Sequence, residues 1–181
     1  EVGVFMNLVK DKIFYHLDTK NFFEPGKSYS IGEKHNPFFA FYERFVPGVM
    51  TISNKPNDLM HEMMKYIRER IYEDERLKIN PALPSRLKCL WVLPEEHLAE
   101  RLQYWTGQLN SRKLVKLSCS GNVHHADQRF LLTQPFNFPM QRYMSHKYWS
   151  GEMMDEINKT ANEEILFTGE IKVLEIMPIN F

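Results

Sequence analysis

Strand-like and helix-like segments alternate irregularly along this chain of 181 residues. Short β-branched or aromatic runs of the kind that form strands lie at residues 13–17, 28–31, 87–93, 114–118, 129–132, 164–167 and 171–176. The segments between these runs differ widely in length, so the even spacing of repeated βαβ units is missing. The pattern therefore predicts an α+β fold with a largely antiparallel or mixed sheet rather than a doubly wound parallel sheet.

Helical periodicity is clearest between Pro56 and about Arg76, where apolar residues recur every four positions among charged ones. This spacing predicts an amphipathic helix. A second helix is expected from Pro94 through Trp105, and a weaker pattern covers residues 144–161. The turn-forming segment 21–39 is expected to be an ordered loop around the strand at 28–31. Without an internal repeat or linker, the chain is expected to form a single domain over residues 1–181.

Charge and hydropathy exclude several classes of function. Lys plus Arg equals Asp plus Glu at 23 each, so no net field attracts the whole molecule to nucleic acid or to an anionic membrane. No segment approaches the roughly 18 apolar residues of a membrane-spanning helix, and the first residues lack the pattern of a secretion signal. We expect a cytoplasmic protein with no membrane partner. Cys89 and Cys119, both in apolar runs, are expected to be reduced thiols.

Common nucleotide and metal motifs are absent. Neither GxGxxG nor GxxxxGK[ST] occurs, which excludes P-loop and kinase-like sites. His124 and His125 lie near Asp127, but adjacent histidines point in different directions and no CxxC or HExxH completes the set. We therefore expect no metal site.

Two segments place polar side chains next to predicted strands. Tyr15 and His16 lie at the end of the first strand, with Thr19 just beyond it, where a strand can deliver an imidazole to a cleft. Ser85 and Arg86 come directly before the strand at 87–93, and a guanidinium there suits a diphosphate. The plain alternatives are a core or edge histidine and an exposed turn.

A third segment, NEEILFTGEIKVLEI, places Glu163 and Glu164 at the start of a strand, followed by a predicted turn at Thr168 and Gly169 and a second alternating strand. Alternation sends the two acids to opposite faces, so only one can reach a given cleft. A carboxylate beside an apolar strand can stabilise the positive charge that develops on a sugar during glycosidic cleavage. The plain alternative is a hairpin with exposed acids.

In their order, these segments resemble the ADP-ribosyltransferase family, in which three strands deliver a His or Arg, a Tyr or Ser, and a Glu. YHLDT resembles the first motif, PSRLKCLWVL the middle strand and NEEILFTGEIKV the third motif, while YWSGE resembles a segment of bacterial members. The resemblance implies a split sheet with flanking helices, with Glu164, His16 and Ser85 as catalytic residues. Tyr42 is the alternative to Ser85.

The resemblance also implies that NAD is the co-substrate and that its glycosidic bond is cleaved as nicotinamide leaves. The residues implied to contact the dinucleotide are His16, Tyr15, Thr19, Arg86, Trp149 and Tyr148. A small, stand-alone domain of this kind resembles the toxins of toxin–antitoxin or phage-defence systems, which implies a macromolecular acceptor and, for a toxin–antitoxin system, an antitoxin partner. Basic and aromatic residues in segment 129–149 favour RNA over protein as acceptor. The alternatives are a non-catalytic protein-binding module, such as an antitoxin, immunity or adaptor protein, and an RNA 2′-phosphotransferase-like enzyme.

Overall fold

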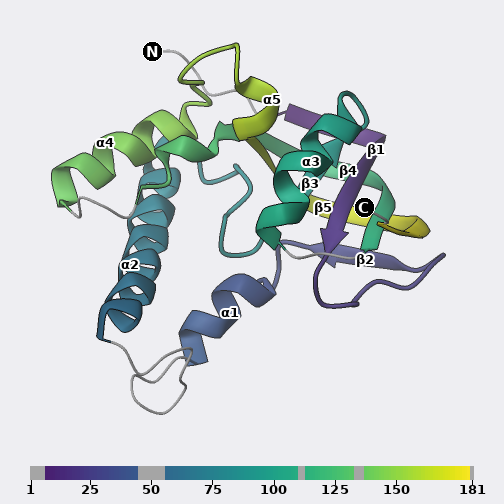
Figure 1. Ribbon diagram of the computed structural model, residues 1–181, viewed down its shortest axis with the longest axis horizontal. Coiled ribbons are helices and arrows are strands. Elements are labelled where there is room, and N and C mark those ends of the chain that lie inside the picture. The colour runs from purple at the N-terminus through teal and green to yellow at the C-terminus, as the bar shows by residue number, and fades with distance from the viewer. Residues whose placement is uncertain (1–6, 45–55, 110–112, 133–136, 180–181) are drawn as a thin grey trace.

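The computed structural model describes residues 7–44, 56–109, 113–132 and 137–179 (Figure 1). Its strands are β1 (Asn7–Asp18), β2 (Ser28–Ile31), β3 (Leu90–Pro94), β4 (Lys113–Asp127) and β5 (Glu163–Pro178). Its helices are α1 (Pro37–Arg44), α2 (Pro56–Ile79), α3 (Leu98–Leu109), α4 (Phe138–Trp149) and α5 (Lys159–Asn162), with a 3₁₀ turn at Gln128–Phe130. The described part of the chain thus combines one antiparallel sheet with several helices.

The five strands follow the order β2-β5-β3-β1-β4, and β5 pairs in addition with β4. The strands β5, β3, β1 and β4 therefore form a closed circuit of antiparallel pairings. This closure depends on the length of β4 and β5, because different parts of each strand pair with different neighbours. The first half of β4 lies between β1 and the second half of β5, and the start of β5 lies between β3 and the second half of β4.

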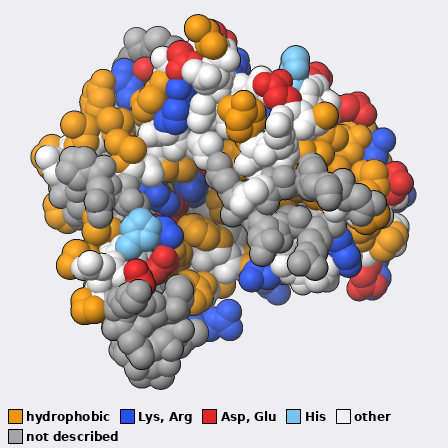
Figure 2. All heavy atoms as spheres, in the orientation of Figure 1, with side chains coloured by type: hydrophobic (Ala, Val, Ile, Leu, Met, Phe, Trp, Pro, Cys, Tyr) orange, Lys and Arg blue, Asp and Glu red, His pale blue; other side chains and the backbone are white. Residues whose placement is uncertain are grey.

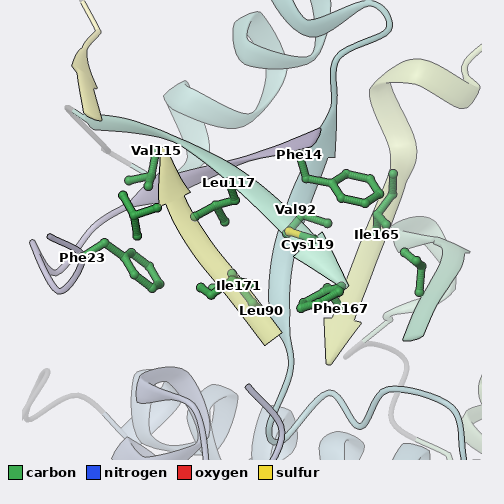
Figure 3. Packing of buried hydrophobic residues seen from close by; sticks show 12 residues of the cluster. Phe14, Phe23, Leu90, Val92, Val115, Leu117, Cys119, Ile165, Phe167 and Ile171 are labelled. Carbon is green, nitrogen blue, oxygen red and sulfur yellow. The ribbon is translucent and has the colours of Figure 1, made fainter. Parts of the chain in front are cut away.

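Alternate residues of these strands form the main core, which the circuit encloses (Figure 3). Side chains one residue apart on a strand point to opposite faces, and the apolar members of β4 and β5 that share this core are two residues apart or a multiple of two. They are Val115, Leu117, Cys119 and Val123 on β4, and Ile165, Phe167, Ile171 and Val173 on β5. Both cysteines are free and buried, as expected from the apolar runs around them.

The outer faces of the sheet are covered by helices. In Figure 1, α2 and α4 lie together on one side of the sheet, and α3 lies beside β3 and β1. A second core packs Tyr72 of α2 and Tyr148 and Trp149 of α4 against Leu166 of β5. A third packs Leu98, Leu102 and Trp105 of α3 against Leu17 and its neighbours. No helix among the described residues combines the length and hydropathy that a membrane crossing requires.

Most predicted elements are present, with several corrections. The run at 164–167 and the run at 171–176 belong to one continuous strand, so the predicted turn at Thr168 and Gly169 is wrong. Segment 129–132 is not a strand, because Asp127 caps a 3₁₀ turn there. The helix α1 forms where a loop was expected, and the pattern at 144–161 corresponds to α4 and α5 with a break after Trp149. The strand expected from residue 87 begins at Leu90.

Candidate active site

Glu163 and Glu164, the first two residues of β5, lie in different environments. Val92 of β3 lies opposite Ile165, and Trp91 lies opposite Leu166. Val92 and Ile165 point into the main core, whereas Trp91 and Leu166 point toward α2 and α4. Because side chains alternate along a strand, Glu164 shares the face of Trp91 and Leu166. The candidate site is built on this face.

The carboxylate of Glu164 is fixed through one oxygen. Its Oε1 accepts hydrogen bonds from Arg86 Nη1 and from the Tyr148 hydroxyl. Arg86 Nη1 also donates to the Tyr148 oxygen at 2.7 Å, which closes a triangle of three buried groups. The other oxygen, Oε2, accepts no hydrogen bond from the described residues and is not among their fully buried, unpartnered atoms. One acceptor of a rigidly held carboxylate thus remains open.

Arg86 is held from its other side by Glu69 of α2. Arg86 Nε donates to Glu69 Oε2 at 2.8 Å and Nη2 to Oε1 at 3.3 Å, while Arg68 Nη2 donates to Oε1 at 2.7 Å. Burial by itself would raise the pKa of Glu69, but the two guanidinium groups outweigh it and hold the pKa below its ordinary value. Burial acts against the charged form of Arg86, yet Glu164 and Glu69 hold its pKa well above the ordinary value.

Aromatic side chains lie next to the carboxylate. Trp91 is half-buried, and the Arg86 guanidinium carbon lies 5.6 Å from its ring centroid. Phe38 of α1 meets the Trp91 ring edge to face at 5.9 Å and is itself exposed. In Figure 2, acidic and basic side chains gather between α2 and the sheet, close to hydrophobic ones. A flat ring on Trp91 would therefore lie beside the open oxygen of Glu164, because the two residues are diagonal neighbours across β3 and β5.

Glu163 belongs to a separate cluster. Its Oε2 accepts from Arg101 Nη2 at 2.7 Å and its Oε1 contacts His125 Nδ1 at 2.9 Å. Burial would raise the pKa of Glu163, but hydrogen bonds from His125 and Arg101 hold it below its ordinary value. The alternation predicted for the two acids is confirmed, since Glu163 and Glu164 contact different partners.

The first-strand residues do not join Glu164. His16 Nδ1 lies 2.8 Å from the carbonyl oxygen of Trp91, and its ring meets Phe23 of the main core edge to face. This contact places His16 on the core side of the sheet, opposite Glu164, and burial lowers its pKa. Tyr15 donates to Glu95 at 3.2 Å, and Thr19 is exposed beyond β1. The sequence pattern located these residues on β1 but not the face that each one would occupy.

Several roles expected from the sequence are not supported by the geometry. Ser85 donates to Glu73 at 2.8 Å rather than to Glu164, and Tyr42 donates to Glu62 at 2.7 Å. Trp149 is fully buried and donates to the carbonyl of Tyr72, so no ring can stack on it. Arg86 is 4% exposed and donates its hydrogen bonds to Glu69, Glu164 and Tyr148. The expected contact between Arg86 and a phosphate is therefore not supported.

The residues that sequence reasoning missed are Glu69, Trp91 and Phe38. Glu69 and Trp91 were part of expected elements, but nothing in a charged helix or an apolar strand distinguishes a site residue from its neighbours. Within the described ranges, no three His, Cys, Asp or Glu side chains are grouped as metal ligands.

Residues 14–178 match the model of a family described as a protein of unknown function, DUF2441. The match covers nearly all of the sequence, including the strands that carry His16 and Glu164 and the turn that carries Arg86, and the chain belongs to this family. A search of curated proteins finds no matching relative.

Proposed function

We propose that this member of the DUF2441 family is an NAD-dependent mono-ADP-ribosyltransferase with Glu164 as its catalytic carboxylate. The observation that carries the proposal is the state of Glu164, whose Oε1 is held by Arg86 and Tyr148 while Oε2 remains open. A carboxylate fixed in this way is preorganised for a positive charge that develops only in the transition state. It needs no rearrangement when that charge appears.

The surroundings of Glu164 suit a nicotinamide riboside group. The half-buried ring of Trp91 offers a surface for a flat heterocycle, and Phe38 limits that surface on one side. A ribose attached to the heterocycle would then reach the open oxygen of Glu164. Two further features support the assignment. The strands with the three expected motifs are consecutive in the sheet, in the order β5-β3-β1. The sheet is antiparallel and has helices beside it, as the α+β class requires.

In the proposed reaction, the bond between the ribose C1′ and the nicotinamide nitrogen breaks, and its electron pair leaves with nicotinamide. Glu164 stabilises the oxocarbenium-like ribose during this step. A nucleophilic oxygen or nitrogen of the acceptor then bonds to C1′ and loses its proton to solvent. His16 contacts the backbone of β3 beneath Trp91, so its role is to support that strand rather than to bind ribose.

RNA is the acceptor that the surface of α4 supports. Phe138 and Tyr143 are exposed on this helix, and Lys147 lies 5.5 Å from the Tyr143 ring centroid. Exposed rings with neighbouring cations can stack single-stranded bases while contacting the backbone. Modification of cellular RNA would be consistent with a toxin that a partner protein must neutralise.

The test compares Glu164→Gln with Glu163→Gln, the same substitution one residue away on the other face. Nicotinamide release from NAD is measured with purified protein, with cell RNA or protein extract added separately, and circular dichroism confirms that both variants are folded. We expect Glu164→Gln to lower release by about a hundredfold or more and Glu163→Gln to retain most of it. Equal activity of wild type and Glu164→Gln would contradict the proposal.

Absence of both release and NAD binding in every mixture would instead favour a non-catalytic binding module. The exposed side chains of Met60 and Met63 on α2 would then be the first surface to test, because methionine-rich surfaces adapt to partner proteins.

A further inference from the structure

We infer that Glu69 is a positioning residue that sets the orientation of Arg86 and, through Arg86, of Glu164; the inference rests on the proposed function of Glu164. Glu69 is 1% exposed and lies on the face of α2 that packs toward the sheet. It touches neither Glu164 nor Trp91 in any hydrogen bond of the described residues. Its influence on the site must therefore pass through Arg86.

The geometry of Arg86 shows why a second carboxylate matters. A guanidinium group presents its donors in a rigid planar fork, so the direction of one edge fixes the direction of the other. Glu69 accepts from Nε and Nη2, which leaves Nη1 directed at Glu164 and Tyr148. Without Glu69, the guanidinium could rotate to form a two-pronged pair with Glu164, which would engage the oxygen that is now open.

The buried ion pairs around Arg86 also balance in charge. Arg68, Glu69, Arg86 and Glu164 alternate in sign along a chain of ion pairs. Removing one member leaves a buried charge without its partner, which is strongly destabilising. A loss of activity in a single variant would therefore not distinguish positioning from simple loss of folding, and the test must separate the two.

Two variants, of which the second keeps the charges balanced, distinguish positioning from loss of folding. Glu69→Gln removes one negative charge, and the double variant Arg68→Met/Glu69→Gln removes one charge of each sign. We expect the double variant to recover much of the thermal stability that Glu69→Gln loses, while kcat for nicotinamide release stays at least about tenfold below wild type and KM for NAD changes by less than about threefold. Recovery of kcat together with stability would overturn the inference.

The matched control is Glu73→Gln. Glu73 lies one turn further along the same helix face and forms a comparable partly buried ion pair with Arg76. It contacts Arg76 and Ser85 but has no hydrogen bond to Arg86. We expect it to lose stability and keep its kcat.

A second readout does not depend on activity. The side-chain carboxyl carbon of Glu164 can be followed by NMR and assigned with Glu164→Gln. We expect this resonance to move in Glu69→Gln and in the double variant but not in Glu73→Gln. If wild type releases no nicotinamide, the proposed function fails and the resonance still decides the inference. An unmoved Glu164 signal in Glu69→Gln would overturn it.

Discussion

Gly121 of β4 and Gly169 of β5 lie directly opposite each other, and the backbones around them leave no room for a side chain at either position. A Cβ on Gly121 would lie 2.1 Å from the carbonyl oxygen of Thr168, and a Cβ on Gly169 would lie 2.5 Å from that of Ser120. Gly169 also has a φ of +137°, which L side chains rarely adopt. The close contact at these glycines allows β5 to pair with β4 along nearly its whole length. The start of the same strand, which carries Glu164, also pairs with β3.

Alanine at either glycine is therefore expected to destabilise the fold. We expect Gly121→Ala and Gly169→Ala each to lower the free energy of unfolding by about 2–4 kcal/mol, because backbone rather than a flexible side chain must move. Urea denaturation measures the change. Gly107→Ala on α3 is the control, since no atom lies within 4 Å of its Cβ position, and it should raise stability by about 0.5–1 kcal/mol. Similar effects at all three positions would contradict this account.

Stability is expected to fall as pH drops from about 6.5 to 4 because of His124. Burial lowers the pKa of this histidine to about 4 against an ordinary value of 6.5. Within this window the unfolded chain binds a proton that the folded chain does not, so acidification favours unfolding, by at most about 3 kcal/mol.

His124→Phe removes the titrating imidazole while its ring can still pack against Trp149, so it should reduce this dependence in urea titrations from pH 7 to 4.5. The buried His16, whose pKa is also lowered, accounts for part of the slope that remains. The exposed His61→Gln variant should keep the wild-type slope. A His124→Phe curve parallel to wild type would show that another group is responsible.

Trp91→Ala is expected to weaken NAD binding by about tenfold or more, because base–aromatic stacking contributes about 1–3 kcal/mol. Phe38→Ala should have a smaller effect, since the Phe38 ring is perpendicular to that of Trp91 and cannot stack on the same heterocycle. Calorimetric titration of NAD gives both affinities. The exposed Phe22→Ala variant on the segment between β1 and β2 serves as control, and unchanged affinity in Trp91→Ala would place the heterocycle elsewhere.

Tyr148→Phe removes a hydroxyl that donates to Glu164 while keeping the ring in the core. We expect kcat for nicotinamide release to fall by about tenfold with little change in KM, because one of two restraints on the carboxylate is lost. Tyr72→Phe is the matched control, since its hydroxyl donates to the carbonyl of Phe130 instead. Tyr72→Phe should lose stability without losing kcat. A loss of kcat in Tyr72→Phe but not in Tyr148→Phe would contradict the assignment.

The double variant Tyr143→Ala/Arg142→Ser tests the acceptor surface. Both side chains are exposed on α4. We expect transfer to RNA to fall by about tenfold, while hydrolysis of NAD without acceptor is unchanged. The measurement is incorporation of labelled ADP-ribose. Full transfer by the variant would remove the argument for RNA at this helix.

Alternation and periodicity allowed the elements to be predicted well where one face of an element is buried. The helix at Pro56, the strand at 28–31 and the separation of Glu163 from Glu164 all follow from local side-chain direction, which the order of residues specifies. The predicted turn at Thr168 and Gly169 failed because a glycine between two strand-like runs suits a turn and a close strand contact equally well. Only the presence of Gly121 across the sheet decides between them.

The α+β class, the strands that carry His16 and Glu164, and the position of Arg86 just before β3 could all be predicted from local residue patterns. Which of these residues contact one another depends on how the strands and helices pack. His16 on β1 and Glu164 on β5 are on strands that flank β3 in the same sheet, yet their side chains lie on opposite faces. Glu69 and Tyr148 reach Arg86 from two separate helices. Contacts of this kind join residues up to 78 positions apart, and they depend on register and helix packing, which local pattern does not encode.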